Sequence, residues 1–275
     1  MTFGARLSAA LDARGSLCVG IDPHTALLDA WGLPHCADGL ARFADTCVRA
    51  FADVAAVVKP QSAFFEMHGA AGITVLERVL ADCRAAGSLV VLDVKRGDIG
   101  STMAAYAQAY LYPSSPLAAD AITVNPFLGV GSLEPVFEQV SAQGAGAFVL
   151  AATSNPQGPQ IQHALTAAGV SVAQTIVDEL AARNAGAEPL GSLGVVAGAT
   201  IEPGVTDFGA LNGPILVPGV GAQGGTAGDV RRVFGDALRA VMPSVSRAVL
   251  RHGPDATALR DAVLRLADDF AFLRG

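Results

Sequence analysis

The sequence predicts a single (β/α)8 barrel, in which eight parallel strands alternate with helices along one chain. Three observations support this fold class. Eight short apolar runs are spread over 275 residues, and apolar residues at helical spacing recur in most of the segments between them. The runs are near-continuous rather than alternating, which is typical of parallel strands buried on both faces. Polar residues gather just after the runs, where barrel enzymes place their chemistry.

Each of the eight predicted strands is followed by loop residues. In chain order they are Leu17–Ile21, Ala55–Lys59, Leu89–Lys95, Ala121–Val124, Ala147–Ala152, Leu193–Ala197, Pro214–Val217 and Leu238–Met242.

Helices are predicted wherever apolar residues recur every three or four positions. The first 15 residues predict a short amphipathic helix before the first strand. Further helices are predicted around residues 40–51, 73–83, 133–140, 172–180, 227–234 and 259–270. With no Pro/Ser-rich linker and no break in composition, residues 1–275 are predicted to form one domain. An open doubly wound sheet is the alternative, but it would normally need fewer strands, and no G-x-G-x-x-G follows the first run.

Composition excludes several classes of function. The net charge is −7 and there is no basic patch, which argues against a nucleic-acid partner. No apolar run reaches the roughly 18 residues of a membrane span. The start of the chain has no basic segment followed by an apolar stretch, and the four cysteines have no C-x-x-C spacing. We therefore expect a cytoplasmic protein with reduced thiols. The scattered histidines predict no metal site.

Lysine usage gives the first indication of chemistry. Of 18 basic residues only Lys59 and Lys95 are lysines, and both end predicted strands. Arginine can serve an ordinary salt bridge, whereas lysine is a compact ammonium that can transfer a proton. The two lysines are therefore candidates for proton chemistry, although they could instead be leftover surface residues in a chain with biased codon usage.

The third predicted strand ends in the densest cluster of charge in the chain, Asp93-Val94-Lys95-Arg96-Gly97-Asp98. Because side chains alternate along a strand, Asp93 and Lys95 should point the same way. Gly97 allows a turn, so Asp98 could swing back to the same mouth or out to a neighbour. Lys59 adds a second cation from the adjacent strand. The alternative interpretation is an ion pair that caps the end of the barrel.

A glycine-rich loop at residues 218–225 predicts an anion site. Its glycines, among them Gly221 and Gly224, let the backbone wrap closely around a ligand. The loop leads into a predicted helix, whose N-terminal N–H groups suit an anion, and Arg247 follows the last strand. Loops after strands 7 and 8 commonly bind phosphate in this fold. A glycine-rich turn without a ligand is the alternative.

These residues together resemble the orotidine 5′-phosphate decarboxylase family. The shared features are Asp93-x-Lys95-x-x-Asp98, Lys59 on the preceding strand, and the Gly-Val-Gly-Ala-Gln-Gly-Gly segment. The sequence D-x-K-R-G-D-I-G-S-T is similar to the longer bacterial branch. The resemblance implies a lyase that needs no cofactor and no metal and acts on a small nucleotide.

The resemblance also implies roles for individual residues. Lys95 would protonate C6 of the pyrimidine, within a charge array of Lys59, Asp93, Lys95 and Asp98. Asp98 and Thr102 would reach into the partner subunit's site, which makes a homodimer the working unit. The substrate would be held by Asp22 and Lys59 at the ribose, Ser154 at the pyrimidine, and Gln223 and Arg247 at the phosphate, with Gln223 also touching the ring.

Two other functions stay open at this point. A sugar-phosphate aldolase or decarboxylase on the same barrel would use the D-x-K-x-x-D carboxylates with Mg²⁺, but it would prefer a carboxylate where Lys59 stands. A catalytically inactive barrel that binds nucleotides is the third possibility.

Overall fold

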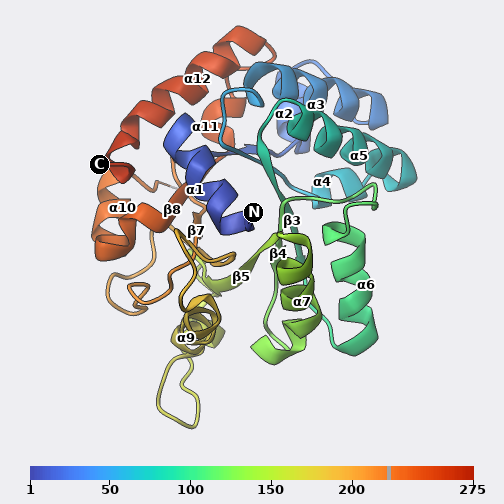
Figure 1. Ribbon diagram of the computed structural model, residues 1–275. Helices are drawn as coiled ribbons and strands as arrows, with labels where there is room; N and C mark the ends of the chain where they lie inside the picture. The colour runs from blue at the N-terminus through green and yellow to red at the C-terminus, as the bar shows by residue number, and fades with distance from the viewer. Residues whose placement is uncertain (222–223) are drawn as a thin grey trace.

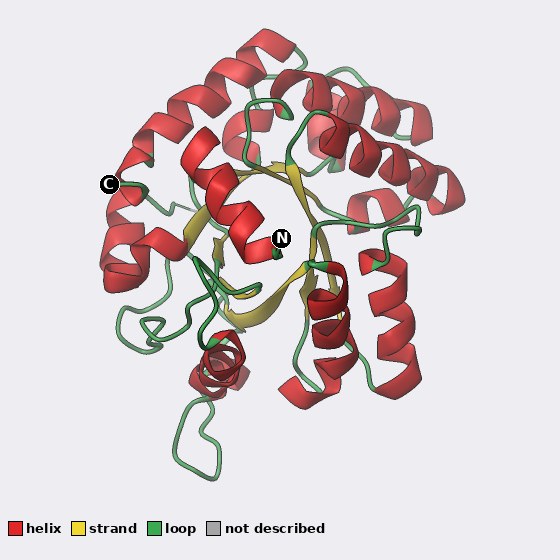
Figure 2. Ribbon diagram, viewed as in Figure 1, coloured by secondary structure: helices red, strands yellow, loops and turns green. Residues whose placement is uncertain are grey.

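The computed structural model describes residues 1–221 and 224–275, and in it eight parallel strands close into one barrel (Figures 1 and 2). Each strand pairs with its neighbours in chain order, and β1 pairs with β8. The predicted fold class is confirmed. That residues 1–275 fold as one domain stays a prediction. The strands are β1 Cys18–Ile21, β2 Val57–Pro60, β3 Leu89–Arg96, β4 Ala121–Val124, β5 Gly146–Ala152, β6 Leu193–Ala197, β7 Ile215–Val217 and β8 Val241–Val245.

The prediction for the eighth strand was wrong in its placement. β8 begins at Val241, and the preceding residues form a 3-10 helix, η2 (Gly235–Ala240). The strand continues through Pro243 and Ser244, residue types that usually end a strand. Pairing explains the difference: Val241 lies opposite Ile215, the first residue of β7, so earlier residues have no partner in that strand.

Helices surround the barrel, as Figure 1 shows. Those that follow a predicted apolar pattern are α1 Phe3–Arg14, α3 Ala37–Phe51, α5 Gly69–Ala85, α7 Glu134–Gln143, α9 Val172–Asn184, α10 Ala227–Phe234 and α12 Ala256–Asp269. The others are α2 Thr25–Ala30, α4 Ala63–Glu66, α6 Gly100–Leu111, α8 Pro159–Gln162, α11 Arg247–Leu250, η1 Val130–Leu133 and η3 Ala271–Leu273. Residues 198–214, between β6 and β7, contain no helix, and no apolar helical pattern was predicted there.

Helix α1 closes one end of the barrel. Figure 2 shows it lying across the ring of strands. Its apolar face, Phe3, Leu7 and Leu11, packs against inward-facing strand residues, and the Phe3 ring meets that of Phe148 edge to face at 6.1 Å. Arg6 also forms an ion pair with Asp120, directly before β4. Because this end is filled, a ligand can enter the barrel only from the carboxyl ends of the strands.

We expect the tight seating of α1 to reverse the usual effect of a glycine-to-alanine substitution in a helix. A Cβ on buried Gly4 would lie 2.0 Å from the Leu190 carbonyl oxygen, whereas one on exposed Gly228 in α10 would meet only Thr226 Oγ1 at 3.5 Å. Gly4→Ala should therefore lower the free energy of unfolding by about 1–3 kcal/mol. Gly228→Ala should raise it by up to about 1 kcal/mol. Denaturant unfolding of both variants measures this, and equal effects would contradict the seating of α1.

Candidate active site

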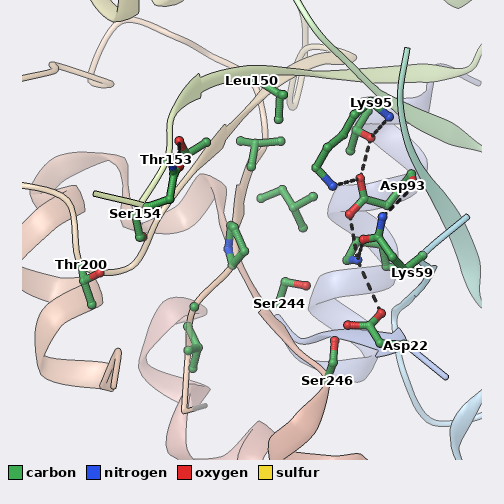
Figure 3. Close-up of a pocket in the computed structure, with 18 of the residues that line it drawn as sticks. Asp22, Lys59, Asp93, Lys95, Leu150, Thr153, Ser154, Thr200, Ser244 and Ser246 are labelled. Carbon is green, nitrogen blue, oxygen red and sulfur yellow. Dashed lines mark hydrogen bonds and ion pairs between the residues drawn. The ribbon is translucent and has the colours of Figure 1, made fainter. Parts of the chain in front are cut away.

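A cavity of about 650 Å³ opens at the carboxyl ends of the strands. Figure 3 shows Asp22, Lys59, Asp93 and Lys95 along one wall, with Thr153, Ser154 and Thr200 across from them. Six of the sequence-predicted site residues line this cavity: Asp22, Lys59, Asp93, Lys95, Ser154 and Arg247. The cavity therefore lies where the position of the polar residues in the sequence indicated.

Asp93 stands between the two lysines. Its Oδ2 accepts a hydrogen bond from Lys59 Nζ at 3.0 Å, and its Oδ1 accepts one from Lys95 Nζ at 2.6 Å. Lys59 Nζ also lies 4.0 Å from Asp22 Oδ1. Asp22, Lys59, Asp93 and Lys95 thus form a row of alternating sign, which we call the ion-pair chain. The expectation that Asp93 and Lys95 point the same way agrees with this arrangement.

Burial makes the ion-pair chain energetically demanding. Lys59 is 5% exposed and Asp93 is 6% exposed, and a buried charge without a partner is strongly disfavoured. Burial opposes the charge on Lys59, but the carboxylates of Asp93 and Asp22 outweigh it and raise the pKa of Lys59. Burial also opposes the charge on Asp93, yet the ammonium groups of Lys59 and Lys95 hold the pKa of Asp93 well below its usual range. Both groups are therefore charged at neutral pH.

Lys95 reaches the cavity from an unusual backbone conformation. Its φ is +46°, in the left-handed region that residues other than glycine adopt at a cost, and the pairing of β3 with β4 shifts register next to it. The Lys95 side chain is 46% exposed on the cavity side, so its ammonium is held by Asp93 and still accessible. Lys95 is thus the exposed end of the ion-pair chain, with its ammonium at the rim of the cavity.

Thr123 on β4 was missed by the sequence analysis. Its hydroxyl donates to Asp93 Oδ1 at 2.7 Å and accepts from the Lys95 backbone N–H at 2.9 Å. One buried side chain thus ties the carboxylate to the backbone of the lysine. A threonine at an inward position of an otherwise apolar strand was the available signal, but it forms no motif. Four more polar residues of the lining were also missed: Gln61, Thr200, Ser244 and Ser246.

The opposite wall presents a hydroxyl that is not satisfied within the described part of the chain. Ser154 Oγ is buried there without a hydrogen-bond partner, and so is Asp22 Oδ1 across the cavity. Small residues make room for these groups. A Cβ on Gly198 would lie 1.7 Å from Ser154 Oγ, and one on Gly20 would lie 3.2 Å from Asp22 Oδ1. The cavity therefore offers polar atoms on both sides of a space that a flat ring could occupy.

The glycine-rich loop lies beside the cavity. Gly219 and Val220 line the cavity together with Arg247, the first residue of α11. Gly221 and Gly224 are not among the lining residues; both have positive φ, and the Gly221 N–H donates to the Gly225 carbonyl at 2.8 Å. Gln223 lies outside the described residues.

The helix after the loop is less available to an anion than the sequence suggested. In α10 the Thr226 hydroxyl accepts from the Asp229 N–H, and the Asp229 carboxylate accepts from the Thr226 N–H. These two side chains therefore already satisfy the N–H groups of Thr226 and Asp229, which an anion could otherwise bind. Arg247 lines the cavity next to the loop and offers it a cation.

Asp98 and Thr102 lie away from the cavity lining within one chain. Asp98 Oδ1 accepts from the Ile99 N–H at 2.8 Å, and Thr102 is exposed on α6. Within residues 1–221 and 224–275, no group of three or more His, Cys, Asp or Glu side chains is placed to hold a metal ion. No described helix is long and apolar enough to cross a membrane.

Comparison with known proteins finds a family model and similar proteins that match nearly the whole chain. The model of the orotidine 5′-phosphate decarboxylase / HUMPS family matches residues 15–262. A protein of Salinispora arenicola named orotidine 5′-phosphate decarboxylase is 60% identical over 275 residues, covering 100% of this chain and 99% of that one. One of that name from Streptomyces coelicolor is 59% identical over 266 residues, covering 96% and 95% of the two chains.

Solved structures agree with these sequence matches. A crystal structure from Streptomyces avermitilis has a TM-score of 0.97 and 56% identity, covering 99% of this chain and 96% of that one. The structure of Leishmania donovani OMP decarboxylase has a TM-score of 0.77 and 28% identity, covering 100% and 99%.

We predict that the Thr123 hydroxyl, and not its shape, supports the end of β3. Thr123→Val keeps the volume but leaves the Lys95 N–H without its acceptor, so the free energy of unfolding should fall by about 1–3 kcal/mol. Thr123→Ser retains the hydroxyl and serves as the control, with a smaller loss than the valine variant. Denaturant unfolding measures both. A valine variant as stable as the unsubstituted protein would contradict the assigned role.

Proposed function

The chain belongs to the orotidine 5′-phosphate decarboxylase / HUMPS family, and we propose that it converts orotidine 5′-monophosphate into uridine 5′-monophosphate and carbon dioxide in pyrimidine biosynthesis. The observation that carries the proposal is the ion-pair chain, which brings two ammonium groups and two carboxylates to one wall of the cavity. We propose that the enzyme works without a cofactor and in the cytoplasm.

In the proposed reaction the bond between C6 and the substrate carboxylate breaks. Its electron pair stays on C6, carbon dioxide leaves, and the Lys95 ammonium donates a proton to C6. A carbanion at C6 is poorly stabilised by its ring, so the enzyme must stabilise the developing charge. An ammonium already fixed by Asp93 does so without reorganising during the reaction. The 2.6 Å contact between Lys95 Nζ and Asp93 supports this role.

Asp93 has a second proposed role. With its pKa held low by the two lysines, it would stand ionised against the substrate carboxylate. Repulsion between the two anions would be relieved as carbon dioxide leaves. Binding energy from distant parts of the substrate would hold the base in this unfavourable position.

The remaining contacts are proposed for those distant parts. Arg247 would bind the phosphate with Gln223, supported by Gly221 and Gly224, and Gln223 would also touch the ring. Asp22 and Lys59 would hold the ribose hydroxyls. Ser154, whose buried hydroxyl has no partner in the described part of the chain, would hydrogen-bond the pyrimidine.

We further propose a homodimer in which Asp98 and Thr102 complete the partner subunit's site and the charge array. Two observations support this. Neither residue lines the cavity of its own chain, and Ile99, which directly follows Asp98, is 62% exposed. A large apolar side chain exposed beside Asp98 would be covered in such a dimer.

The proposed activity is tested by following the loss of absorbance of orotidine 5′-monophosphate with purified, EDTA-treated protein. Rapid loss is expected, because no step of the proposed reaction uses a metal. If the nucleotide is unchanged but the protein acts on a sugar phosphate once Mg²⁺ is added, the protein is instead a Mg²⁺-dependent sugar-phosphate aldolase or decarboxylase. Binding of uridine 5′-monophosphate without any turnover would indicate an inactive, nucleotide-binding barrel.

Lys95→Arg is expected to abolish most turnover while the protein still folds. Arginine keeps the positive charge but stays protonated, and its planar group cannot occupy the position of a compact ammonium. We expect turnover to fall by at least about 10²–10³-fold. Circular dichroism and thermal unfolding serve as the check on folding. Near-normal turnover in a folded variant would refute the role of proton donor.

Mixing two inactive variants tests the proposed sharing of the site between subunits. Asp98→Ala and Lys95→Ala chains should each be inactive alone. If Asp98 acts across the interface, mixed dimers contain one site with both residues intact, so part of the activity should return. Absence of recovery, with subunit exchange shown by mass spectrometry, would place Asp98 in the site of its own chain.

A further inference from the structure

The end of β3 is held from outside the barrel by the side chain of Arg96. The guanidinium donates to Glu66 Oε1 at 2.6 Å, to the Tyr110 hydroxyl at 3.3 Å and to the Val94 carbonyl at 3.2 Å. It also lies over the ring of Tyr106, 5.7 Å from its centroid. These contacts join β3 to α4 and α6. We call Arg96 with Glu66 and Tyr110 the Arg96 clamp.

The clamp encloses the one residue of β3 that has a left-handed backbone. Lys95 stands between Val94, whose carbonyl Arg96 binds, and Arg96 itself, so the guanidinium bridges across it. Conformations of this kind cost energy and persist only where the surrounding structure fixes them. The Thr123 hydroxyl holds Lys95 from the inner side by accepting a hydrogen bond from the Lys95 N–H. The clamp is the corresponding support on the outer side.

The clamp is also connected to Asp93. Glu66 accepts a second hydrogen bond, from the Ser62 hydroxyl at 2.6 Å, and the Ser62 N–H donates to the Asp93 carbonyl at 3.2 Å. The backbone of Asp93 and the backbone around Lys95 are thus tied to the same carboxylate. A shift of Glu66 or Arg96 would move both partners of the 2.6 Å ion pair at the rim of the cavity.

We propose that Arg96 is a positioning residue for Lys95, which sets where the ammonium lies without touching the substrate. The inference rests on the proposed decarboxylase function for its kinetic consequence, but its structural part is independent of that function. Loss of the clamp should let the Lys95 backbone relax and move the ammonium away from Asp93. Misplacing a catalytic group by an ångström can cost as much as about 10²-fold in rate.

The chain offers a closely matched control. Arg183 on α9 forms an ion pair with Glu134 at 2.7 Å and lies over the ring of Phe137, 4.6 Å from its centroid. Its side chain is 33% exposed, against 28% for Arg96. It combines the same kinds of contact but does not touch β3. Any effect of Arg96→Gln that Arg183→Gln lacks is therefore due to its place next to Lys95.

The experiment measures two properties of Arg96→Gln and Arg183→Gln. The first is steady-state kinetics with orotidine 5′-monophosphate. The second is hydrogen exchange in protein labelled with ¹⁵N-lysine, which gives only two backbone amide signals, Lys59 and Lys95, because the chain has no other lysine. Lys95→Arg assigns the signals, and exchange rates are corrected for the changed neighbour.

In Arg96→Gln we expect kcat to fall by about tenfold or more with KM nearly unchanged. The Lys95 amide should exchange about tenfold faster and the Lys59 amide at its former rate, because only Lys95 loses a support. Arg183→Gln should change neither property. Unchanged Lys95 exchange, or equal kinetic losses in the two variants, would overturn the proposal.

Two provisions keep the outcomes distinct. Glu66→Gln removes the negative charge of the clamp with little change in shape. This variant replaces Arg96→Gln if Arg96→Gln does not fold. If the unsubstituted protein does not decarboxylate the nucleotide, the proposed function fails, while faster Lys95 exchange in the clamp variants would still support the positioning role. Failure of the exchange prediction in an active enzyme refutes the clamp alone.

Discussion

The structure depends on one carboxylate that two buried or half-buried ammonium groups share. Without Lys59 and Lys95, burial would raise the pKa of Asp93; without Asp93, the two ammonium groups would lose the carboxylate that lies between them. Such a group is costly to assemble only for stability. The arrangement is better explained as a fixed electrostatic field, which a reaction with a carbanionic transition state requires.

Much of the fold holds the charged side chains of the ion-pair chain in fixed positions. Helix α1 fills the opposite end of the barrel, so the cavity has a packed floor and a single opening. The absence of a side chain at Gly20 leaves space for Ser246. Thr123 supports the end of β3 from inside, and in our proposal Arg96 supports it from outside. These contacts fix Asp93 and Lys95 before a substrate arrives, which is what electrostatic preorganisation demands.

The sequence predicted the barrel and six lining residues because both follow from local patterns. Near-continuous apolar runs mark buried parallel strands, and the polar residues at their ends must meet at one mouth. The eighth strand was misplaced because its position depends on pairing with β7, not on the apolar run alone. Thr123 and the left-handed backbone of Lys95 were not predicted, since a single hydroxyl and a register shift arise from contacts between strands and leave no motif.

The measurement that tests the central claim most directly is the pKa of Lys59. Lysine labelled with ¹³C at the ε-carbon gives two signals in this chain, and titration by NMR follows each one in the folded protein. If Asp93 and Asp22 outweigh burial, Lys59 stays charged above the ordinary lysine value of about 10.5, and Asp93→Asn lowers its pKa. A Lys59 that loses its proton below that value in the unsubstituted protein would show that burial dominates. That result would contradict a fixed, fully charged ion-pair chain.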